Sequence, residues 1–117
     1  MNQEKELGKI TKVSIEIEDH GILTFWLNFD FGGSGQGFGG YAIENDLGTK
    51  AIRKIMETVG VDAWEKIPGH EMYVHRENGI IRAIEAPKYN GGKYFNIKTF
   101  YEESATNHKE ETKKVEP

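Results

Sequence analysis

A run of glycines in the first third of the chain limits most strongly what this sequence can fold into. Six of the fourteen glycines lie within the nine residues from Gly32 to Gly40. Glycine loses more conformational freedom on folding than any other residue, so a glycine run adds no stability by itself. The run therefore predicts a loop that approaches another group closely or adopts dihedral angles that other residues avoid.

The composition is typical of a small globular domain. The chain has 117 residues and contains no cysteine, which excludes disulfide bonds and cysteine-based metal sites. It opens without the apolar run of a signal peptide, and no uncharged apolar stretch approaches the ~18 residues of a membrane helix. We therefore expect a single domain over residues 1–103, located in the cytoplasm and without contact with a membrane. The formal net charge of −4 disfavours nucleic-acid binding driven by phosphate neutralisation alone.

Two stretches around residue 20 alternate between apolar and polar residues, as half-buried strands do. They cover residues 10–18 and 23–31, and the turn residues Asp19-His20-Gly21 lie between them. This pattern predicts an antiparallel hairpin with one core face. The apolar residues expected on that face are Val13, Ile15, Ile17, Leu23, Phe25, Leu27, Phe29 and Phe31.

A helix and a second hairpin are predicted after the glycine run. Apolar residues follow helical spacing from residue 47 to residue 59, Asp46 can cap the first turn, and Gly60 suits the position after the last turn. Asn78-Gly79, between two further alternating runs, is a strong signal for a hairpin with a type I′ turn. Residues 94–97 can pair as a final strand.

The fold class that follows is α+β. We expect a mostly antiparallel sheet of two hairpins plus a final strand, with one main helix packed on one face. The last residues, 104–117, are polar and charged without periodicity, which predicts a disordered tail.

The glycine run contains the spacing G-x-G-x-x-G at Gly35, Gly37 and Gly40. A dinucleotide site would need a helix that opens directly after the last glycine within a βαβ unit, and this sequence has neither. The run could still offer backbone N–H groups to an anion, with side chains that add hydrogen bonds or aromatic contacts. The candidate binding residues are Trp26, Asp30, Ser34, Gly35, Gln36, Gly37, Phe38 and Tyr41.

Trp26 falls on the strand face opposite the phenylalanines. We expect it either to be exposed for binding or to be covered by another element. A homodimer would supply such cover.

No set of residues predicts catalysis or a resident metal. The four histidines lack the spacing of a zinc site, and no serine–histidine–acid arrangement stands out. Asp30, Glu44 and Asp46 flank the glycine run and could bind Mg²⁺, although accepting N–H groups and capping the helix are simpler roles. We therefore expect a protein without enzymatic activity and without a cofactor.

Two parts of the chain resemble a group of small uncharacterised proteins of bacteriophages and prophages. The resemblance covers roughly residues 9–100, and it implies no assigned chemistry for any residue. Small phage domains without a catalytic constellation include inhibitors of host defence, such as anti-CRISPR proteins. The residues that carry the resemblance are Glu18-Asp19-His20-Gly21-Ile22-Leu23-Thr24 with Asp30-Phe31-Gly32-Gly33-Ser34-Gly35-Gln36-Gly37-Phe38-Gly39-Gly40-Tyr41, and Val59-Gly60-Val61-Asp62-Ala63-Trp64-Glu65 with Pro68-Gly69.

The resemblance leads to the first functional hypothesis. The chain would be a phage-encoded, non-enzymatic inhibitor that binds and blocks a component of bacterial defence, a CRISPR effector in particular, in the cytoplasm of the host. Phe38, Tyr41 and Trp26 would supply the aromatic anchors of the interface.

Two alternatives remain open. The chain could be a nucleotide sponge whose glycine loop cradles phosphates while Arg76 or Lys50 neutralises their charge. It could also be an accessory protein of phage recombination that binds single-stranded nucleic acid by stacking bases on Tyr73, Tyr89 and Tyr94.

Overall fold

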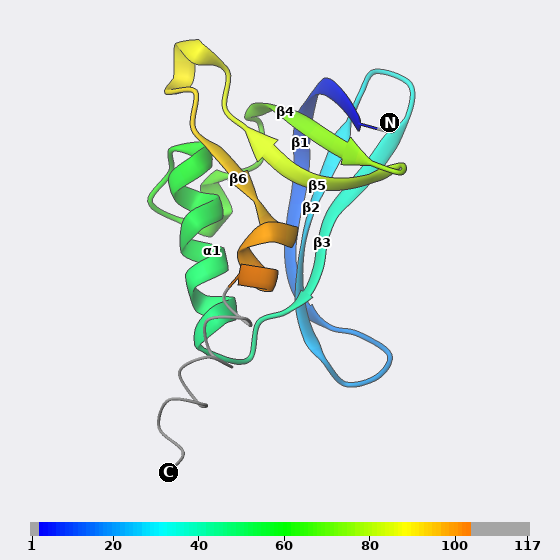
Figure 1. The fold of residues 1–117 in the computed structure, drawn as a ribbon, viewed down its shortest axis with the longest axis vertical. Helices are drawn as coiled ribbons and strands as arrows, with labels where there is room; N and C mark the ends of the chain where they lie inside the picture. Colours follow the sequence, from blue (N-terminus) through cyan, green and yellow to red (C-terminus); the bar gives the residue numbers. More distant parts are fainter. Residues whose placement is uncertain (1–2, 104–117) are drawn as a thin grey trace.

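The computed structural model describes residues 3–103, in which helices pack against one face of a curved antiparallel sheet (Figure 1). A second helix occupies residues 97–103, directly after the last strand. The predicted α+β class is confirmed, whereas the tail predicted for residues 104–117 lies outside the described residues. The elements are β1 (Gln3–Ile17), β2 (Leu23–Asp30), β3 (Gly35–Ala42), α1 (Asp46–Val59), η1 (Trp64–Lys66), β4 (Glu71–Glu77), β5 (Ile80–Glu85), η2 (Lys88–Asn90) and β6 (Tyr94–Asn96).

The six strands lie in the order β3-β2-β1-β4-β5-β6, and every neighbouring pair is antiparallel. Strand β1 joins the two halves of the sheet, because residues 3–9 pair with β4 and residues 9–17 pair with β2. A bulge between Ile10 and Lys12 lies next to this change of partner, and bulges bend a strand. As a result β4 and β5 cross the direction of β2 and β3 (Figure 1).

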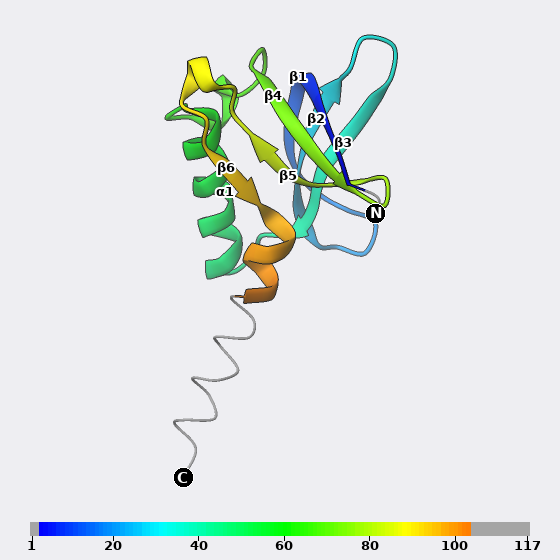
Figure 2. The same cartoon turned by 45° about the horizontal axis from the view of Figure 1, so that its top comes forward.

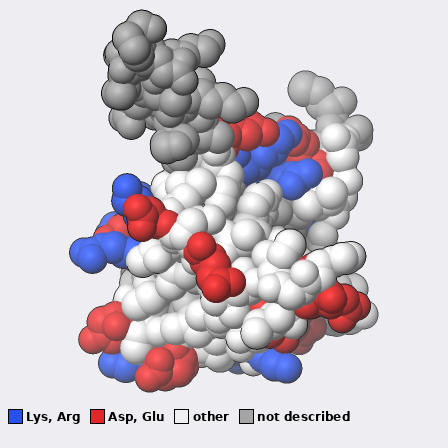
Figure 3. Space-filling model, turned by 90° about the horizontal axis from the view of Figure 1, so that it is seen from below, with Lys and Arg blue, Asp and Glu red and all other residues white. Residues whose placement is uncertain are grey.

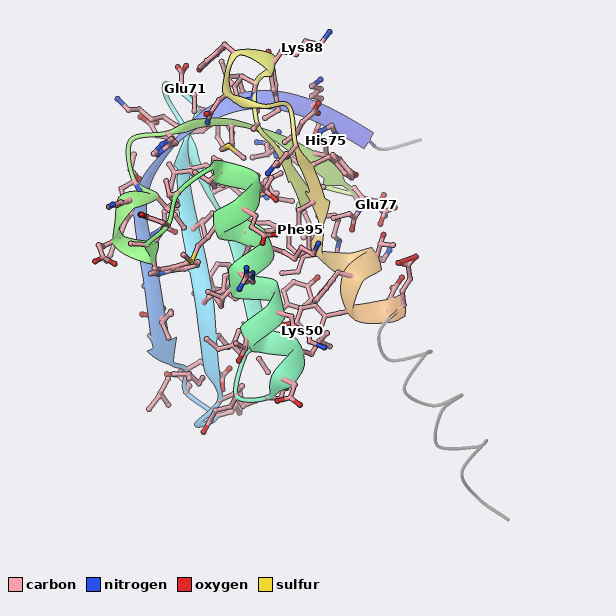
Figure 4. All side chains as sticks on the ribbon, turned by 90° about the vertical axis from the view of Figure 1, so that its left-hand side faces the viewer. Lys50, Glu71, His75, Glu77, Lys88 and Phe95 are labelled. Atoms are coloured by element: carbon pink, nitrogen blue, oxygen red, sulfur yellow. The ribbon has the colours of Figure 1, made fainter. Side chains whose placement is uncertain are left out.

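The core lies between α1 and one face of the sheet. Phe25 and Leu27 of β2 and Ile55 of α1 are fully buried, as their spacing in the sequence predicts. Figure 2 shows β6 running beside α1, and in Figure 4 Phe95 points from β6 towards the helix. Each such side chain contributes roughly 1.5–3 kcal/mol when it is fully buried, so this layer stabilises the fold. None of the helices within residues 3–103 has the length and hydropathy needed to cross a bilayer.

Helix α1 begins at Asp46, the residue predicted as its cap, so the cap lies one residue earlier than predicted. The side-chain oxygen of Asn45 accepts the N–H of Gly48 at 2.6 Å, so Asn45 is the cap and Asp46 is the first helical residue. At that position the negative charge of Asp46 still interacts favourably with the positive N-terminal end of the helix dipole. Gly60 ends the helix with φ of 94°, which confirms its predicted role.

Both predicted hairpins form, but the first one differs from prediction at its end. Asn78 and Gly79 have φ of 53° and 81°, which confirms the type I′ turn. The end of the β1–β2 hairpin projects away from α1 (Figure 1), so Ile15 and Ile17 are 46% and 72% exposed rather than buried. Alternation shows which residues share a face, but it does not show how much of that face a helix covers.

Candidate functional site

The glycine loop predicted from the sequence is a strand. Gly35–Ala42 pair with β2 as β3, and the connecting turn covers residues 31–34. Glycine carries no side chain that could display a period of two, so this strand leaves no alternating pattern in the sequence. The prediction of a loop over residues 35–40 was therefore wrong.

The indole ring of Trp26 explains why β3 is rich in glycine. A Cβ atom at Gly37 would lie 2.9 Å from ring atom Cε3 of Trp26, and one at Gly40 would lie 2.8 Å from Cζ2. Gly39 has φ of 136° and lies close to the backbone of Phe25, at the irregularity in the β2–β3 pairing. A strand of its own chain thus covers Trp26, and no second copy is needed to explain its position.

The other two aromatic candidates are engaged inside the protein. Phe38 is buried, and its ring meets that of Phe25 edge-on with 6.1 Å between the centroids. Tyr41 stacks on Tyr101 of the C-terminal helix with 4.8 Å between the centroids, and its hydroxyl accepts a hydrogen bond from Arg82 at 3.2 Å. Phe38 therefore does not fit the role of an interface anchor, and Tyr41 helps to hold the C-terminal helix.

The candidate residues Asp30 and Ser34 form hydrogen bonds with other residues of the 31–34 segment. Asp30 accepts the N–H of Gly32 at 3.1 Å, as its simpler predicted role required, and the N–H of Phe31 donates to the carbonyl of Ser34 at 2.9 Å. Gly35 begins β3 at the exposed end of this turn. The segment is a tight turn between strands, and the candidate residues Asp30, Ser34, Gly35, Gln36 and Gly37 line one open surface hollow beside it.

Gln36 connects two parts of the sheet that are far apart in the strand order. Its side-chain N–H donates to the carbonyl of Gly79 at 2.7 Å, and its side-chain oxygen accepts from Nε of Arg76 at 2.6 Å. Arg76 also pairs with Glu6 at 2.8 Å and lies 4.7 Å from the ring centroid of Phe31. These contacts close the curved sheet between β3 and the β4–β5 hairpin.

The register of the sheet aligns four side chains in a row on the face opposite the core. Leu7 of β1 lies opposite Tyr73 of β4, Tyr73 lies opposite Glu85 of β5, and Glu85 lies opposite Tyr94 of β6. Leu7 and Tyr94 are 42% and 54% exposed. We define the tyrosine face as this row together with its neighbours Lys5 and His75.

An ion-pair network lies at the centre of the tyrosine face. Nε2 of His75 and Nζ of Lys5 lie 2.8 Å and 3.5 Å from Oε1 of Glu85. The hydrogen bond with His75 and the charge of Lys5 hold the pKa of Glu85 below its usual value, against the opposing effect of burial. Lys5 also lies 4.5 Å from the ring centroid of Tyr73, and the His75 ring meets that of Tyr94 edge-on at 5.2 Å. The network therefore holds both tyrosine rings in place.

A cavity of about 330 Å³ adjoins the tyrosine face, and Lys5, His75 and Tyr94 contribute to its walls. On its far side Nζ of Lys98, in the C-terminal helix, lies 2.7 Å from Oε1 of Glu77. This hydrogen bond lowers the pKa of Glu77 and raises the pKa of Lys98. In Figure 4 His75 and Glu77 lie away from α1, and Figure 3 shows lysine or arginine side chains in contact with acidic ones at the upper edge of the view.

The tyrosine face was only partly visible in the sequence. Tyr73 and Tyr94 stood out as aromatic residues among basic ones, whereas Leu7 carried no signal. The four residues of the row come from four strands, and only the register of those strands brings them together. Within residues 3–103, no three histidine or acidic side chains form a metal-binding group, so Asp30, Glu44 and Asp46 do not make the Mg²⁺ site that was considered.

No protein-family model, no curated protein and no solved structure matches this chain.

Proposed function

We propose that this chain is a binding protein that docks onto another protein through the tyrosine face and blocks it by occlusion. The observation that carries the proposal is the row of Leu7, Tyr73, Glu85 and Tyr94, which crosses four adjacent strands on the face opposite the core. Tyrosine is enriched among the side chains that dominate protein interfaces. Because the ion-pair network holds the two rings before binding, docking costs less conformational entropy.

We propose a component of bacterial defence as the partner, and a CRISPR effector within that class. The resemblance to small phage proteins, carried by residues 18–41 and 59–69, supports this choice. An inhibitor of this kind needs an interface rather than turnover. The aromatic anchors proposed here are Tyr73 and Tyr94, in place of the Phe38, Tyr41 and Trp26 expected from the sequence.

The test is an interference assay in bacteria that carry a CRISPR system and are infected by a targeted phage. The wild-type chain is expected to restore plating of that phage, and the double variant Tyr73→Ser, Tyr94→Ser is expected not to. Tyr89→Ser is the matched control, because Tyr89 is 79% exposed but lies in η2, outside the tyrosine face. Thermal melts of the three purified proteins show whether each variant keeps its fold.

Two results would count against this proposal. Full inhibition by a folded double variant would place the interface elsewhere on the molecule. A wild-type chain that restores plating in no strain of a panel with different CRISPR systems would overturn the choice of a CRISPR effector.

A second candidate function is binding of single-stranded nucleic acid. Tyr73, Tyr94 and His75 on one sheet face beside Lys5 resemble the stacking platforms of proteins that bind single strands. Against this function, the carboxylate of Glu85 in the middle of the face and the net charge of −4 repel the phosphates of a nucleic acid. Fluorescence anisotropy with a labelled oligonucleotide separates the two functions: salt-sensitive binding that the double variant loses favours this one, and no binding at low salt rules it out.

The nucleotide sponge keeps less structural support than the other two functions. The glycine segment is paired as β3, and Arg76, one of the two residues expected to neutralise phosphate, is already bonded to Glu6 and Gln36. A thermal-shift screen against nucleotides tests this alternative directly, because a ligand that binds the folded chain raises its melting temperature.

A further inference from the structure

The end of the β1–β2 hairpin carries apolar side chains that the core does not use. Ile15 and the more exposed Ile17 lie on the face that elsewhere packs against α1. Ile17 pairs with Leu23, whose carbonyl accepts the N–H of Ile43 at 3.0 Å, so the segment that leads into α1 borders the same surface. We define the hairpin patch as Ile15, Ile17, Leu23 and Ile43.

Backbone hydrogen bonds hold the hairpin patch in one shape. Beyond the last strand pair, the N–H of Glu18 donates to the carbonyl of Ile22 at 2.9 Å, and the N–H of Gly21 donates to the carbonyl of Glu18 at 2.8 Å. The isoleucine side chains therefore meet water on a hairpin whose backbone is hydrogen-bonded up to its turn. Contiguous apolar surface with a polar surround is typical of an interaction site.

The surroundings of the hairpin patch are acidic. Figure 3 looks onto this end of the molecule and shows a broad uncharged area with acidic side chains within and beside it and charged side chains of both signs along its edges. Residues 15–23 and 43–46 contain no lysine or arginine. Glu16 alternates with Ile15 and Ile17 and lies on the other face of the hairpin, so the acidic residues that border the patch are Glu18, Asp19, Glu44 and Asp46.

This charge selects among the surfaces that could cover the patch. A second copy of the chain, docked patch to patch, would bring two acidic rims together, and like charges across an interface are costly. An anionic membrane surface would be repelled in the same way. A basic protein surface instead gains from the charge.

We infer that the hairpin patch is a docking surface for a protein whose exposed apolar side chains are rimmed by lysine and arginine. Burial of the isoleucines supplies affinity, and the acidic rim selects the partner and speeds association. The hairpin patch shares no residue with the tyrosine face, so the two proposals can fail independently.

The test is a two-dimensional NMR titration of the full chain with two amphipathic helical peptides, one of leucine and lysine and the other of leucine and glutamate. We expect the leucine–lysine peptide to shift the amide signals of residues 14–24 and 43–46, and the leucine–glutamate peptide to leave them unchanged. Ile17→Thr keeps a β-branched strand residue and is expected to weaken the binding about tenfold. Ile80→Thr is the matched control, because Ile80 is 50% exposed at the end of the other hairpin.

Three outcomes would overturn the inference. The first is equal binding of both peptides, and the second is a set of shifts that lies outside the hairpin patch. The third is concentration-dependent self-association, measured by light scattering and lost in Ile17→Thr, which would show that a second copy occupies the patch. Binding of the leucine–lysine peptide that weakens with added salt and with the variant Glu18→Gln, Asp19→Asn would support it.

Discussion

The indole ring of Trp26 lies against the backbone of Gly37, in space that any side chain at position 37 would fill. Trp26 pairs with Gly39 across the β2–β3 ladder, so the ring reaches a diagonal neighbour along the same face. Glycine favours strands poorly, and an aromatic ring that packs over it offsets this weakness. The contact accounts for an edge strand that composition alone would not predict.

Substitution of Gly37 by alanine should destabilise the protein by about 1–3 kcal/mol, because the methyl group must displace the Trp26 ring. Urea denaturation measures the change. Gly33→Ala is the control and should stay within about 0.5 kcal/mol, since nothing lies within 4 Å of a Cβ atom there. In a Trp26→Ala background Gly37→Ala should cost much less; an unchanged cost would mean that the ring is not the cause.

Substitution of Gly48 by alanine sets helix propensity against packing. Alanine favours a helix interior over glycine by about 1 kcal/mol. A Cβ atom at Gly48 would, however, overlap the backbone of Ile43, which cannot move as a side chain could. We expect a net loss of at least about 2 kcal/mol in thermal or urea unfolding, with exposed Lys50→Ala in the same helix nearly neutral. A more stable Gly48→Ala protein would show that the chain before α1 can move aside.

Replacement of Gln36 by leucine should open the contact between β3 and the β4–β5 hairpin. The largely buried guanidinium of Arg76 would lose an acceptor, and the carbonyl of Gly79 would lose a donor. Loss of such a partner costs about 1–3 kcal/mol. In urea denaturation the double variant Gln36→Leu, Arg76→Met should cost less than the sum of the single variants. Additive costs would show that the two side chains do not depend on each other.

Stability should fall in acid partly because of Glu85. Its pKa is lowered in the folded chain by the hydrogen bond with His75 and by the charge of Lys5, and both partners are lost on unfolding. The unfolded chain therefore binds the proton first, so stability is present above the unfolded pKa and is lost as the pH falls through the folded pKa.

Melting temperatures measured from about pH 6 down to about pH 3 test this linkage. Wild type should lose more stability over this range than Glu85→Gln, which has no carboxyl to protonate at that position. Glu65→Gln, at an exposed position in η1, is the control for removal of one negative charge. Parallel curves for wild type and Glu85→Gln would contradict the assignment.

Elements with a clear local signal were predicted correctly. The apolar spacing of α1, the glycine at its end and the Asn78-Gly79 turn each depend on a few neighbouring residues, so their conformations follow from local chemistry. Strand β3 was missed because its glycines show no alternation between apolar and polar residues. Its packing also depends on the Trp26 ring, which lies against Gly37 but comes eleven residues earlier in the chain. The candidate site was missed in part for a similar reason, since Leu7 meets Tyr73 only through the pairing of β1 with β4.

The sequence by itself determined the α+β class, the main helix, both hairpin turns and the shared faces of the strands, because period and turn chemistry act over short distances. The tertiary structure alone decided what covers each face. It placed Trp26 over glycines, left Ile17 exposed beyond α1 and aligned Tyr73 with Tyr94 across β5. The burial of a strand face and the register of strand pairing depend on segments that come into contact only when the chain is folded. A local sequence pattern therefore does not predict them.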